Sequence, residues 1–157
     1  MEVNLETTRA DCELSPLLLK HRDILVCPAC GASLRSIGNS LGCVADQHTF
    51  PCVQGIPQLF WPNEWDASQP DVTEAVRAFY EEHPFPHYEE IDSARGLQEK
   101  AERGTFARLL DEQIPPRAWI LEVGCGTGQL SNFLGLTSGR TVFGVDLCLN
   151  SLRLGKR

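Results

Sequence analysis

Apolar and polar positions alternate differently along three parts of the chain. Between Leu17 and Phe60, short β-prone runs are separated by glycines and polar residues, which is typical of a small antiparallel β module. The Gly38-Asn39 pair lies between two such runs and predicts a hairpin turn. We expect strands at Ile24–Val26, Leu34–Ile37 and Thr49–Val53.

The second part, residues 61–116, has the apolar spacing of helices. Asp71-Val-Thr-Glu74 is a capping-box pattern that predicts a helix start, and His83-Pro84-Phe85-Pro86 stops that helix. A second helix is expected from about Ala94 to Gln113, before Pro115-Pro116. The apolar residues at helical spacing are Val72, Val76, Phe79 and Tyr80 in the first helix, and Leu97, Ala101, Leu109 and Leu110 in the second.

The third part, residues 117–157, alternates between strand and helix patterns. Ala118–Val123 is an apolar run interrupted by one acid, which suits a buried parallel strand. Three glycines follow, then a helical pattern, then a second strand at Thr141–Val145. This order predicts the start of a βαβ unit and therefore an α/β fold. The apolar positions of the intervening helix are Leu130, Phe133 and Leu134.

Length and composition suggest how these parts are organised. A chain of 157 residues can form one medium domain or two small ones, and no apolar run reaches the roughly 18 residues of a membrane span. Residues 1–11 carry acids without an apolar core, so we expect a disordered tail rather than a secretory leader, and a cytoplasmic location. The expected segments are a tail at 1–16, a β module at 17–60, a helical connector at 61–116 and an α/β portion at 117–157.

The charge of the chain restricts its partners. A formal net charge of -7 and a pI of about 5.0 argue against a broad nucleic-acid face, because phosphate binding depends on clustered Lys and Arg. We therefore expect no DNA and no membrane partner. A local basic groove on an acidic protein would still be enough for an RNA substrate.

Seven cysteines are unevenly distributed, and four of them lie in one short stretch: Cys27, Cys30, Cys43 and Cys52. An odd number of cysteines without a secretory leader argues against a disulfide framework and for a metal site with free thiols. Cys27-Pro-Ala-Cys30-Gly31 has the spacing of a metal knuckle, because two thiolates separated by two residues can chelate one ion.

Cys43 follows this knuckle after a hairpin-sized gap and is the expected third ligand. The fourth ligand is open between His48, Cys52 and Asp46. Thiolates with one imidazole form a usual closed structural site for Zn²⁺. We therefore predict a zinc ion, which would stabilise a segment too small to have a sufficient core of its own.

The segment Glu122-Val-Gly-Cys-Gly-Thr-Gly128 joins the first strand of the third part to its helix. Alternate glycines let a backbone turn sharply and approach a ligand closely. Asp146 ends the second strand, where a carboxylate can accept hydrogen bonds from both ribose hydroxyls. The dinucleotide fingerprint requires a glycine where this chain has Gln129, so the spacing disfavours a dinucleotide.

The acid-x-Gly-x-Gly-x-Gly pattern resembles the first motif of class I S-adenosylmethionine-dependent methyltransferases, and Asp146 matches their second acidic position. The resemblance implies a Rossmann-like sheet, S-adenosyl-L-methionine as cofactor and methylation as the activity. It would place Glu122 under the methionine end of the cofactor and Asp146 at the ribose. The implied cofactor-binding residues are Glu122, Gly124, Cys125, Gly126, Gly128 and Asp146.

Such a methyltransferase needs a seven-stranded sheet, and residues 117–157 account for its first two strands and the helix between them. Substrate and catalytic residues of this class come mostly from later strands. We therefore expect the chain to be a fragment with weak or no catalysis by itself, and residues 117–157 leave the catalytic residues unknown.

Two further features, one in the third part and one in the second, have more than one interpretation. Cys125 is either a nucleophile, since a helix N-terminus lowers a thiol pKa, or a small filler, which we prefer. The segment Phe79–Tyr88 resembles the aromatic and proline stretch that covers the cofactor pocket in some such methyltransferases. Its His83, His87 or Tyr88 could contact substrate, although a packed aromatic connector explains the segment equally well.

The cysteine-rich part resembles the zinc-ribbon-like domain of the tRNA-methyltransferase activator family, through residues 23–31 and 49–60. A similar module stands at the N-terminus of a ribosomal-RNA guanine methyltransferase family. Many members have a second Cys-x-x-Cys pair, whose last position here is Asp46. The ribosomal-RNA enzymes place a histidine two residues before an aromatic, as in His48 and Phe50, and this makes His48 our first choice for the fourth ligand.

Two functions of different classes follow. The first is a methyltransferase whose zinc-ribbon module assists binding of the methyl acceptor, which could be RNA, protein or a small molecule. The second is a zinc-ribbon adaptor that docks on a protein partner and carries a vestigial methyltransferase portion.

Overall fold

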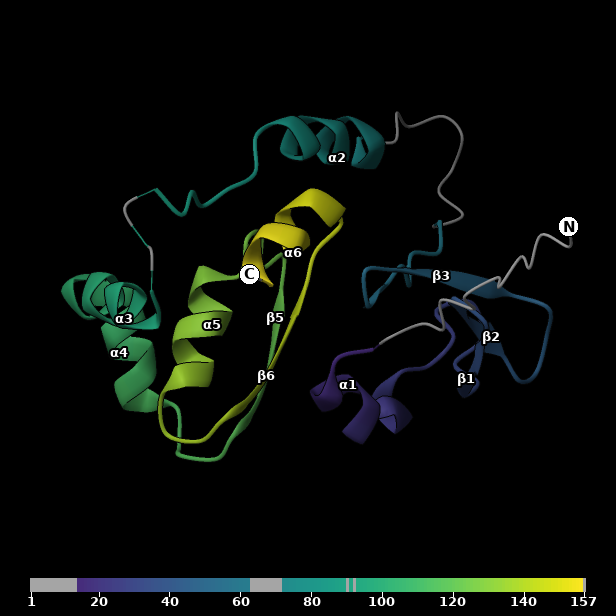
Figure 1. Cartoon of the computed structure of the whole chain (residues 1–157), viewed down its shortest axis with the longest axis horizontal. Helices are drawn as coiled ribbons and strands as arrows, with labels where there is room; N and C mark the ends of the chain where they lie inside the picture. Colours follow the sequence, from purple (N-terminus) through teal and green to yellow (C-terminus); the bar gives the residue numbers. More distant parts are fainter. Residues whose placement is uncertain (1–13, 63–71, 90, 92, 157) are drawn as a thin grey trace, which may run out of the picture. The chain divides into compact units, whose positions relative to one another are not determined.

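The structure is a computed structural model that describes residues 14–62, 72–89, 91 and 93–156. The chain divides into two compact units, Met1–Glu64 and Trp65–Arg157. The protein is mixed α/β, with an antiparallel sheet in the first unit and a separate parallel sheet in the second (Figure 1). Within the described ranges, none of the helices combines the length and the apolar character needed to cross a membrane.

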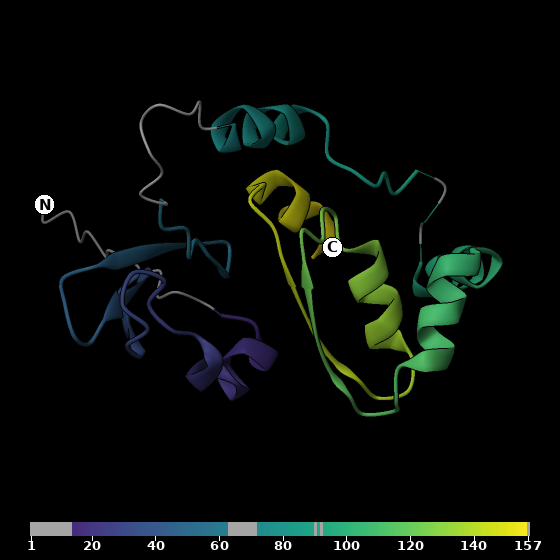
Figure 2. The same cartoon turned by 180° about the vertical axis from the view of Figure 1, so that it is seen from behind.

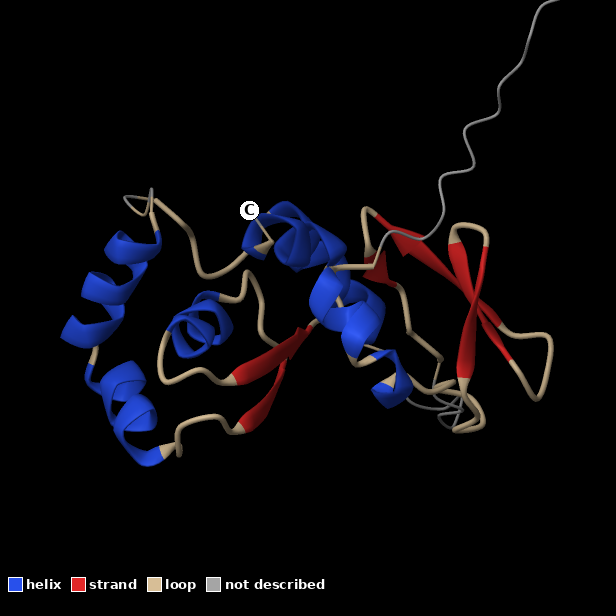
Figure 3. Cartoon of the chain, turned by 60° about the horizontal axis from the view of Figure 1, so that its bottom comes forward, coloured by secondary structure: helices blue, strands red, loops and turns tan. Residues whose placement is uncertain are grey.

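The first unit is built around four antiparallel strands in sequential order, drawn in red in Figure 3. They are β1 (Leu34–Ile37), β2 (Ser40–Cys43), β3 (Thr49–Val53) and β4 (Ile56–Pro57), preceded by the short helix α1 (Pro16–Lys20) and a 3₁₀ turn, η1 (Arg22–Ile24). The predicted hairpin at Gly38-Asn39 is confirmed, since Ile37 pairs with Ser40 across it. The predicted strands at Leu34–Ile37 and Thr49–Val53 are confirmed as well.

The strand predicted at Ile24–Val26 is wrong. Ile24 ends the 3₁₀ turn, and Val26 makes only an isolated bridge to Ser33. The chain turns back on itself between these two bridged residues, and that turn holds Cys27 and Cys30. A β-prone triplet so close to a tight loop has no neighbouring strand along which to extend a ladder.

The described part of the second unit contains three helices, a parallel strand pair with a helix between its strands, and a last helix (Figure 2). The elements are α2 (Thr73–Glu82), α3 (Ala94–Arg103), α4 (Thr105–Gln113), β5 (Trp119–Val123), α5 (Gln129–Leu136), β6 (Thr141–Val145) and α6 (Leu149–Gly155). β5 and β6 are parallel, with Glu122 opposite Gly144. The predicted order of strand, glycine turn, helix and strand is confirmed.

The core of the second unit lies between the sheet and the helices of one layer. Leu97 of α3 packs against Phe133 and Leu134 of α5, and Ile120 of β5 reaches the same cluster. The alternate residues of β5 lie on the other face and are exposed, so the predicted burial of this strand holds for one face only. They are Trp119, Leu121 and Val123, which are 59%, 63% and 77% exposed.

The helix predicted from Ala94 to Gln113 is in fact two helices. Gly104 separates α3 from α4 in an extended conformation, with φ -82° and ψ 117°. Glycine is among the poorest helix formers, so a helical apolar pattern that runs through it is easily interrupted. Leu109, predicted to face the core, is exposed.

The first helix of this part also differs from the prediction. α2 is present, but its N-cap is Val72 and has no side-chain capping bond. Asp71, the first residue of the predicted capping box, lies outside the described residues. The apolar side chains of α2, including Phe79, are largely exposed, so its helical spacing does not mark a buried face within the described structure.

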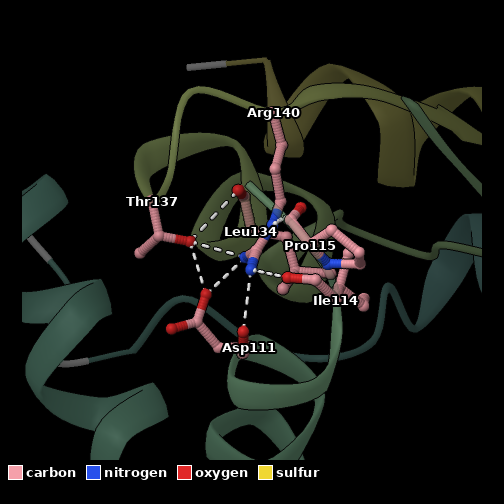
Figure 4. Close-up of polar contacts among 6 residues, drawn as sticks. All are labelled: Asp111, Ile114, Pro115, Leu134, Thr137 and Arg140. Carbon is pink, nitrogen blue, oxygen red and sulfur yellow. Dashed lines mark hydrogen bonds and ion pairs between the residues drawn. The ribbon is translucent and has the colours of Figure 1, made fainter. Parts of the chain in front are cut away.

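Arg140 fixes α4 to the turn between α5 and β6 (Figure 4). Its buried guanidinium donates to the Asp111 carboxylate and to the Thr137 hydroxyl. It also donates to three backbone carbonyls at the end of α4, those of Asp111, Ile114 and Pro115. All five N–H groups are thus used, and a cation among the last carbonyls of a helix is favoured by the helix dipole.

Candidate functional sites

The three cysteines predicted as metal ligands converge in the first unit. Cys27 and Cys30 lie in the loop that the Val26–Ser33 bridge closes, and Cys43 ends β2. Their sulfur atoms all lie within 4.8 Å of one another, and Cys30 Sγ is 3.5 Å from Cys43 Sγ. Two sulfurs on one tetrahedral Zn²⁺ are about 3.8 Å apart, so the cluster has the dimensions of a metal site.

The backbone around these sulfurs directs N–H groups at them, which favours the thiolate form of the cysteines. Gly31 has φ +74°, a left-handed conformation that favours glycine, and this turn brings the Ala32 N–H to the Cys30 sulfur. The N–H groups of Ala45 and Asp46 approach the Cys43 sulfur in the same way. N–H donors directed at sulfur stabilise thiolate, which is the form that binds metal.

The thiols influence one another strongly. The Ala32 N–H acts to lower the pKa of Cys30, but Cys43, burial, Cys27 and Asp46 together raise it to about 12. Burial acts to raise the pKa of Cys43, but the N–H groups of Ala45 and Asp46 and the Cys30 thiol lower it. Neighbouring thiolates therefore repel one another, and a bound cation is what allows several to be ionised together.

The candidates for the fourth ligand lie in different surroundings. His48 Nδ1 is 3.7 Å from Cys27 Sγ, close to the roughly 3.6 Å expected between sulfur and nitrogen on a tetrahedral Zn²⁺. The same nitrogen is 3.1 Å from Asp46 Oδ1, so both side chains border the cluster. Neither of them belongs to the compact group of ligand atoms, which consists of the three sulfurs.

Cys52 is disulfide-bonded, which removes it as a metal ligand. This disulfide also runs against the expectation that the cysteines would serve only a metal site and free thiols. The other cysteines of the described residues are free thiols: Cys27, Cys30, Cys43, Cys125 and Cys148.

The glycine loop of the second unit connects β5 to α5 at the carboxyl ends of the two parallel strands. Gly124, Gly126 and Gly128 all have positive φ, between +54° and +72°, which accounts for glycine at alternate positions. All five backbone N–H groups from Gly124 to Gly128 donate within the chain. Their acceptors are the carbonyls of Val145, Cys125 and Phe85 and the carboxylate of Asp146.

The two predicted acids lie on either side of this loop. Glu122, near the end of β5, accepts a 2.5 Å hydrogen bond from the Ser131 hydroxyl of α5. Asp146, directly after β6, accepts from the Gly126 N–H through Oδ2 and from the Cys148 N–H through Oδ1, both at 2.8 Å. Each oxygen of Asp146 has a second lone pair, so the carboxylate can accept further hydrogen bonds.

Cys125 is buried inside the loop, and its environment favours the filler interpretation. Burial, together with the charges of Asp146 and Glu122, raises the pKa of Cys125 to about 11. A nucleophilic cysteine needs the opposite shift. Gly144 makes room for this thiol, because a Cβ at that position would lie 2.9 Å from Cys125 Sγ.

The aromatic segment that precedes α3 contacts the glycine loop. The Tyr88 hydroxyl donates to the Thr127 carbonyl and accepts from Asn132, while His87 borders a groove of about 490 Å³. His83 packs against the Phe79 ring instead. The other residues that line the groove are Phe85, Pro86, Glu89, Lys100 and Gln129.

Several residues of this site gave no signal in the sequence. Ser131 binds Glu122, and Glu81 of α2 accepts from the Leu149 and Asn150 N–H groups at the start of α6. Gln129 attracted notice only because it is not glycine, yet its amide donates to the His87 carbonyl. The contacts of Glu81 and Gln129 join segments about 40 to 70 residues apart, and spacing along the chain cannot reveal them.

Comparison of the sequence with models of protein families gave no match, and comparison with curated proteins gave none either. The functional interpretation therefore rests on the geometry of the two sites.

Proposed function

We propose that the second unit binds S-adenosylmethionine at the carboxyl ends of β5 and β6, as the cofactor-binding portion of a Rossmann-like methyltransferase. The observation that carries this proposal is the pair of carboxylates beside a glycine loop at the ends of two adjacent parallel strands. Ligands of open parallel α/β sheets bind at this end of the strands.

The hydrogen bonds of the loop favour a ligand without phosphate groups. A phosphate site presents free N–H groups, whereas the N–H groups from Gly124 to Gly128 are all used within the chain. Glu122 and Asp146 add negative charge, which repels phosphate and suits a sulfonium cation. Asp146 would bind the ribose hydroxyls, and Glu122 would lie at the methionine end.

The cofactor would supply an activated methyl group on sulfur. The contribution expected of the protein is to hold the acceptor in line with that bond, since direct displacement depends mainly on positioning. In the first unit we propose a Zn²⁺ ion bound by Cys27, Cys30 and Cys43, with His48 as fourth ligand. The distance from His48 Nδ1 to Cys27 Sγ supports this choice.

Equilibrium dialysis of the whole chain against labelled ligands tests the cofactor. We expect S-adenosylmethionine to bind at least about tenfold more tightly than ATP or NAD⁺, because the loop has no N–H donors for their phosphates. Equal or tighter binding of ATP or NAD⁺ would overturn the proposal.

Metal analysis of the purified chain tests the zinc site. We expect one zinc per chain, and its absence would overturn the metal assignment. A chain that contains zinc but retains none of the three labelled ligands would favour the second candidate, an adaptor that docks through its zinc-binding unit. The three converging cysteines are the observation that keeps this alternative in view.

A further inference from the structure

A continuous segment of the second unit, Tyr80–Tyr88, lies across the glycine loop and the start of α6. We call this segment the strap. At its beginning, the Glu81 carboxylate accepts from the Leu149 N–H at 2.9 Å and from the Asn150 N–H at 3.2 Å. The Cys148 thiol donates to the Tyr80 carbonyl, at 3.1 Å. The strap is therefore anchored at the start of α6, which follows Asp146 closely along the chain.

The middle of the strap is attached to the glycine loop through three consecutive backbone carbonyls. The Phe85 carbonyl accepts from the Thr127 N–H at 3.1 Å, and the Pro86 carbonyl accepts from the Thr127 hydroxyl at 2.5 Å. The His87 carbonyl accepts from the Gln129 amide, at 2.5 Å. Here the strap contributes backbone acceptors, and the side chains that donate to them are Thr127 of the loop and Gln129 at the start of α5. The Tyr88 hydroxyl of the strap adds a hydrogen bond to the Thr127 carbonyl.

Gly126 links the strap to the proposed ligand site. A Cβ at position 126 would lie 2.0 Å from the Phe85 carbonyl oxygen, so the strap backbone rests directly on this glycine. The N–H of the same residue donates to Asp146 Oδ2. A ligand that engages the Asp146 carboxylate therefore acts on residue 126, and a shift of residue 126 acts on the strap.

We propose that the strap is the gate of the ligand site and that Thr127 and Gln129 hold it closed. The identity of the ligand, S-adenosylmethionine, rests on the proposed function. Thr127 and Gln129 are positioning residues, because they act on the ligand through the strap. Opening the strap frees the Thr127, Leu149 and Asn150 N–H groups, while closing it encloses whatever is bound beside Asp146.

Gln129→Glu is the most informative variant. It keeps the size of the side chain but replaces the amide donor with a carboxylate, which repels the His87 carbonyl. A purely structural role of residue 129 at the first position of α5 predicts the opposite effect, since an acid at a helix N-terminus is stabilising. The matched control is Arg95→Gln, which alters an exposed hydrogen bond to Glu99 on α3.

Amide hydrogen exchange of the whole chain, resolved by residue, reads out the strap directly. In Gln129→Glu we expect exchange at the Thr127 amide to be about tenfold faster, with unchanged exchange in Arg95→Gln. Unchanged exchange at Thr127 in a folded Gln129→Glu variant would overturn the proposal. Gln129→Ala, which only removes the donor, should give a smaller increase of the same sign.

Stopped-flow binding of S-adenosylmethionine tests what the strap controls. We expect the association and dissociation rate constants of Gln129→Glu both to rise about tenfold, with Kd changed by less than about threefold. A change in Kd with unchanged amide hydrogen exchange at Thr127 would overturn the gate. If the unaltered chain binds no S-adenosylmethionine while Thr127 exchange responds as expected, the proposed function fails and the gate for that ligand fails with it, but the strap attachment stands.

Discussion

Among single residues, a comparison of Gly126 with Gly124 distinguishes two reasons for glycine in this loop, namely a positive φ and a lack of space for a side chain. Both residues have positive φ, so a side chain at either position would strain the backbone. They differ in their surroundings, because a Cβ at Gly126 would lie 2.0 Å from the Phe85 carbonyl oxygen, whereas a Cβ at Gly124 would meet nothing within 4 Å. Gly126 is thus required by both φ and the strap.

We therefore expect Gly126→Ala to lower the free energy of unfolding by about 1–3 kcal/mol more than Gly124→Ala. The second variant serves as the control for backbone strain, which the two share. Urea denaturation monitored by far-ultraviolet circular dichroism measures the difference. Equal losses of stability would show that the strap does not rest on residue 126.

We expect the Asp111 carboxylate to make a contribution to the free energy of unfolding that is lost in acid. Hydrogen bonds from Thr137 and Arg140 hold the pKa of this carboxyl below its usual range. A depressed folded pKa gives stability that is complete above the unfolded value of about 3.9 and is lost as pH falls through the folded value. Asp111→Asn should cost about 1–2 kcal/mol at pH 7, because the buried Arg140 loses its counter-charge.

The same variant defines the test for Asp111. The difference in unfolding free energy between the unaltered chain and Asp111→Asn should shrink below about pH 4 as Asp111 becomes protonated. A difference that stays constant down to the acid transition would mean that the charge on Asp111 contributes nothing.

Residue types and spacing were enough to place the two acids and the three cysteines. Glu122 and Asp146 do lie beside the glycine loop, and the three sulfurs do converge. Thr127 and Gln129 were missed because their partners are backbone carbonyls of a distant segment, which any residue type can provide. Cys52 was misjudged because spacing alone does not distinguish a metal ligand from a disulfide partner.

At the scale of elements, the first unit combines a small core with a metal-sized cluster. Among residues 14–62, its buried apolar residues form two groups of three, around Leu41 and around Phe50, and cysteines belong to both groups. A core of this size contributes little stability by itself. We therefore expect a chelator to lower the melting temperature of this unit by at least about 10 °C, measured by calorimetry on the whole chain.

The fourth ligand can be decided by comparing two variants. If His48 binds the metal and Asp46 supports it through the 3.1 Å contact, His48→Ala should weaken zinc binding more than Asp46→Ala, which should cost about 10- to 100-fold. Competition with a chromophoric chelator measures both affinities. The reverse order would assign the fourth position to Asp46.

Helices α3 and α4 and strand β5 show where the apolar pattern of the sequence mispredicts the structure. Apolar spacing continued through Gly104 and predicted one helix, but α3 ends at this glycine and α4 begins after it. The apolar run of β5 predicted a buried strand, but helices cover only one of its faces in the described structure. The periodicity of apolar residues predicts whether a helix or a strand forms. How many faces of that element are buried depends on the other elements that pack against it.

In the molecule as a whole, each of the two compact units carries one of the two proposed binding sites. The proposed metal site belongs to the first unit and the proposed cofactor site to the second. We expect calorimetry to resolve two unfolding transitions, of which a chelator shifts only one. A single transition that moves as a whole with metal would contradict this division.

We propose above all that the carboxyl ends of β5 and β6 bind S-adenosylmethionine through Asp146. The most direct test is isothermal titration of S-adenosylmethionine into the unaltered chain, into Asp146→Asn, and into Glu99→Gln as a control for the loss of one charge. We predict one site per chain, at least about tenfold weaker binding in Asp146→Asn, and no change in Glu99→Gln. No detectable binding to the unaltered chain, or equal affinity in Asp146→Asn, would contradict the account.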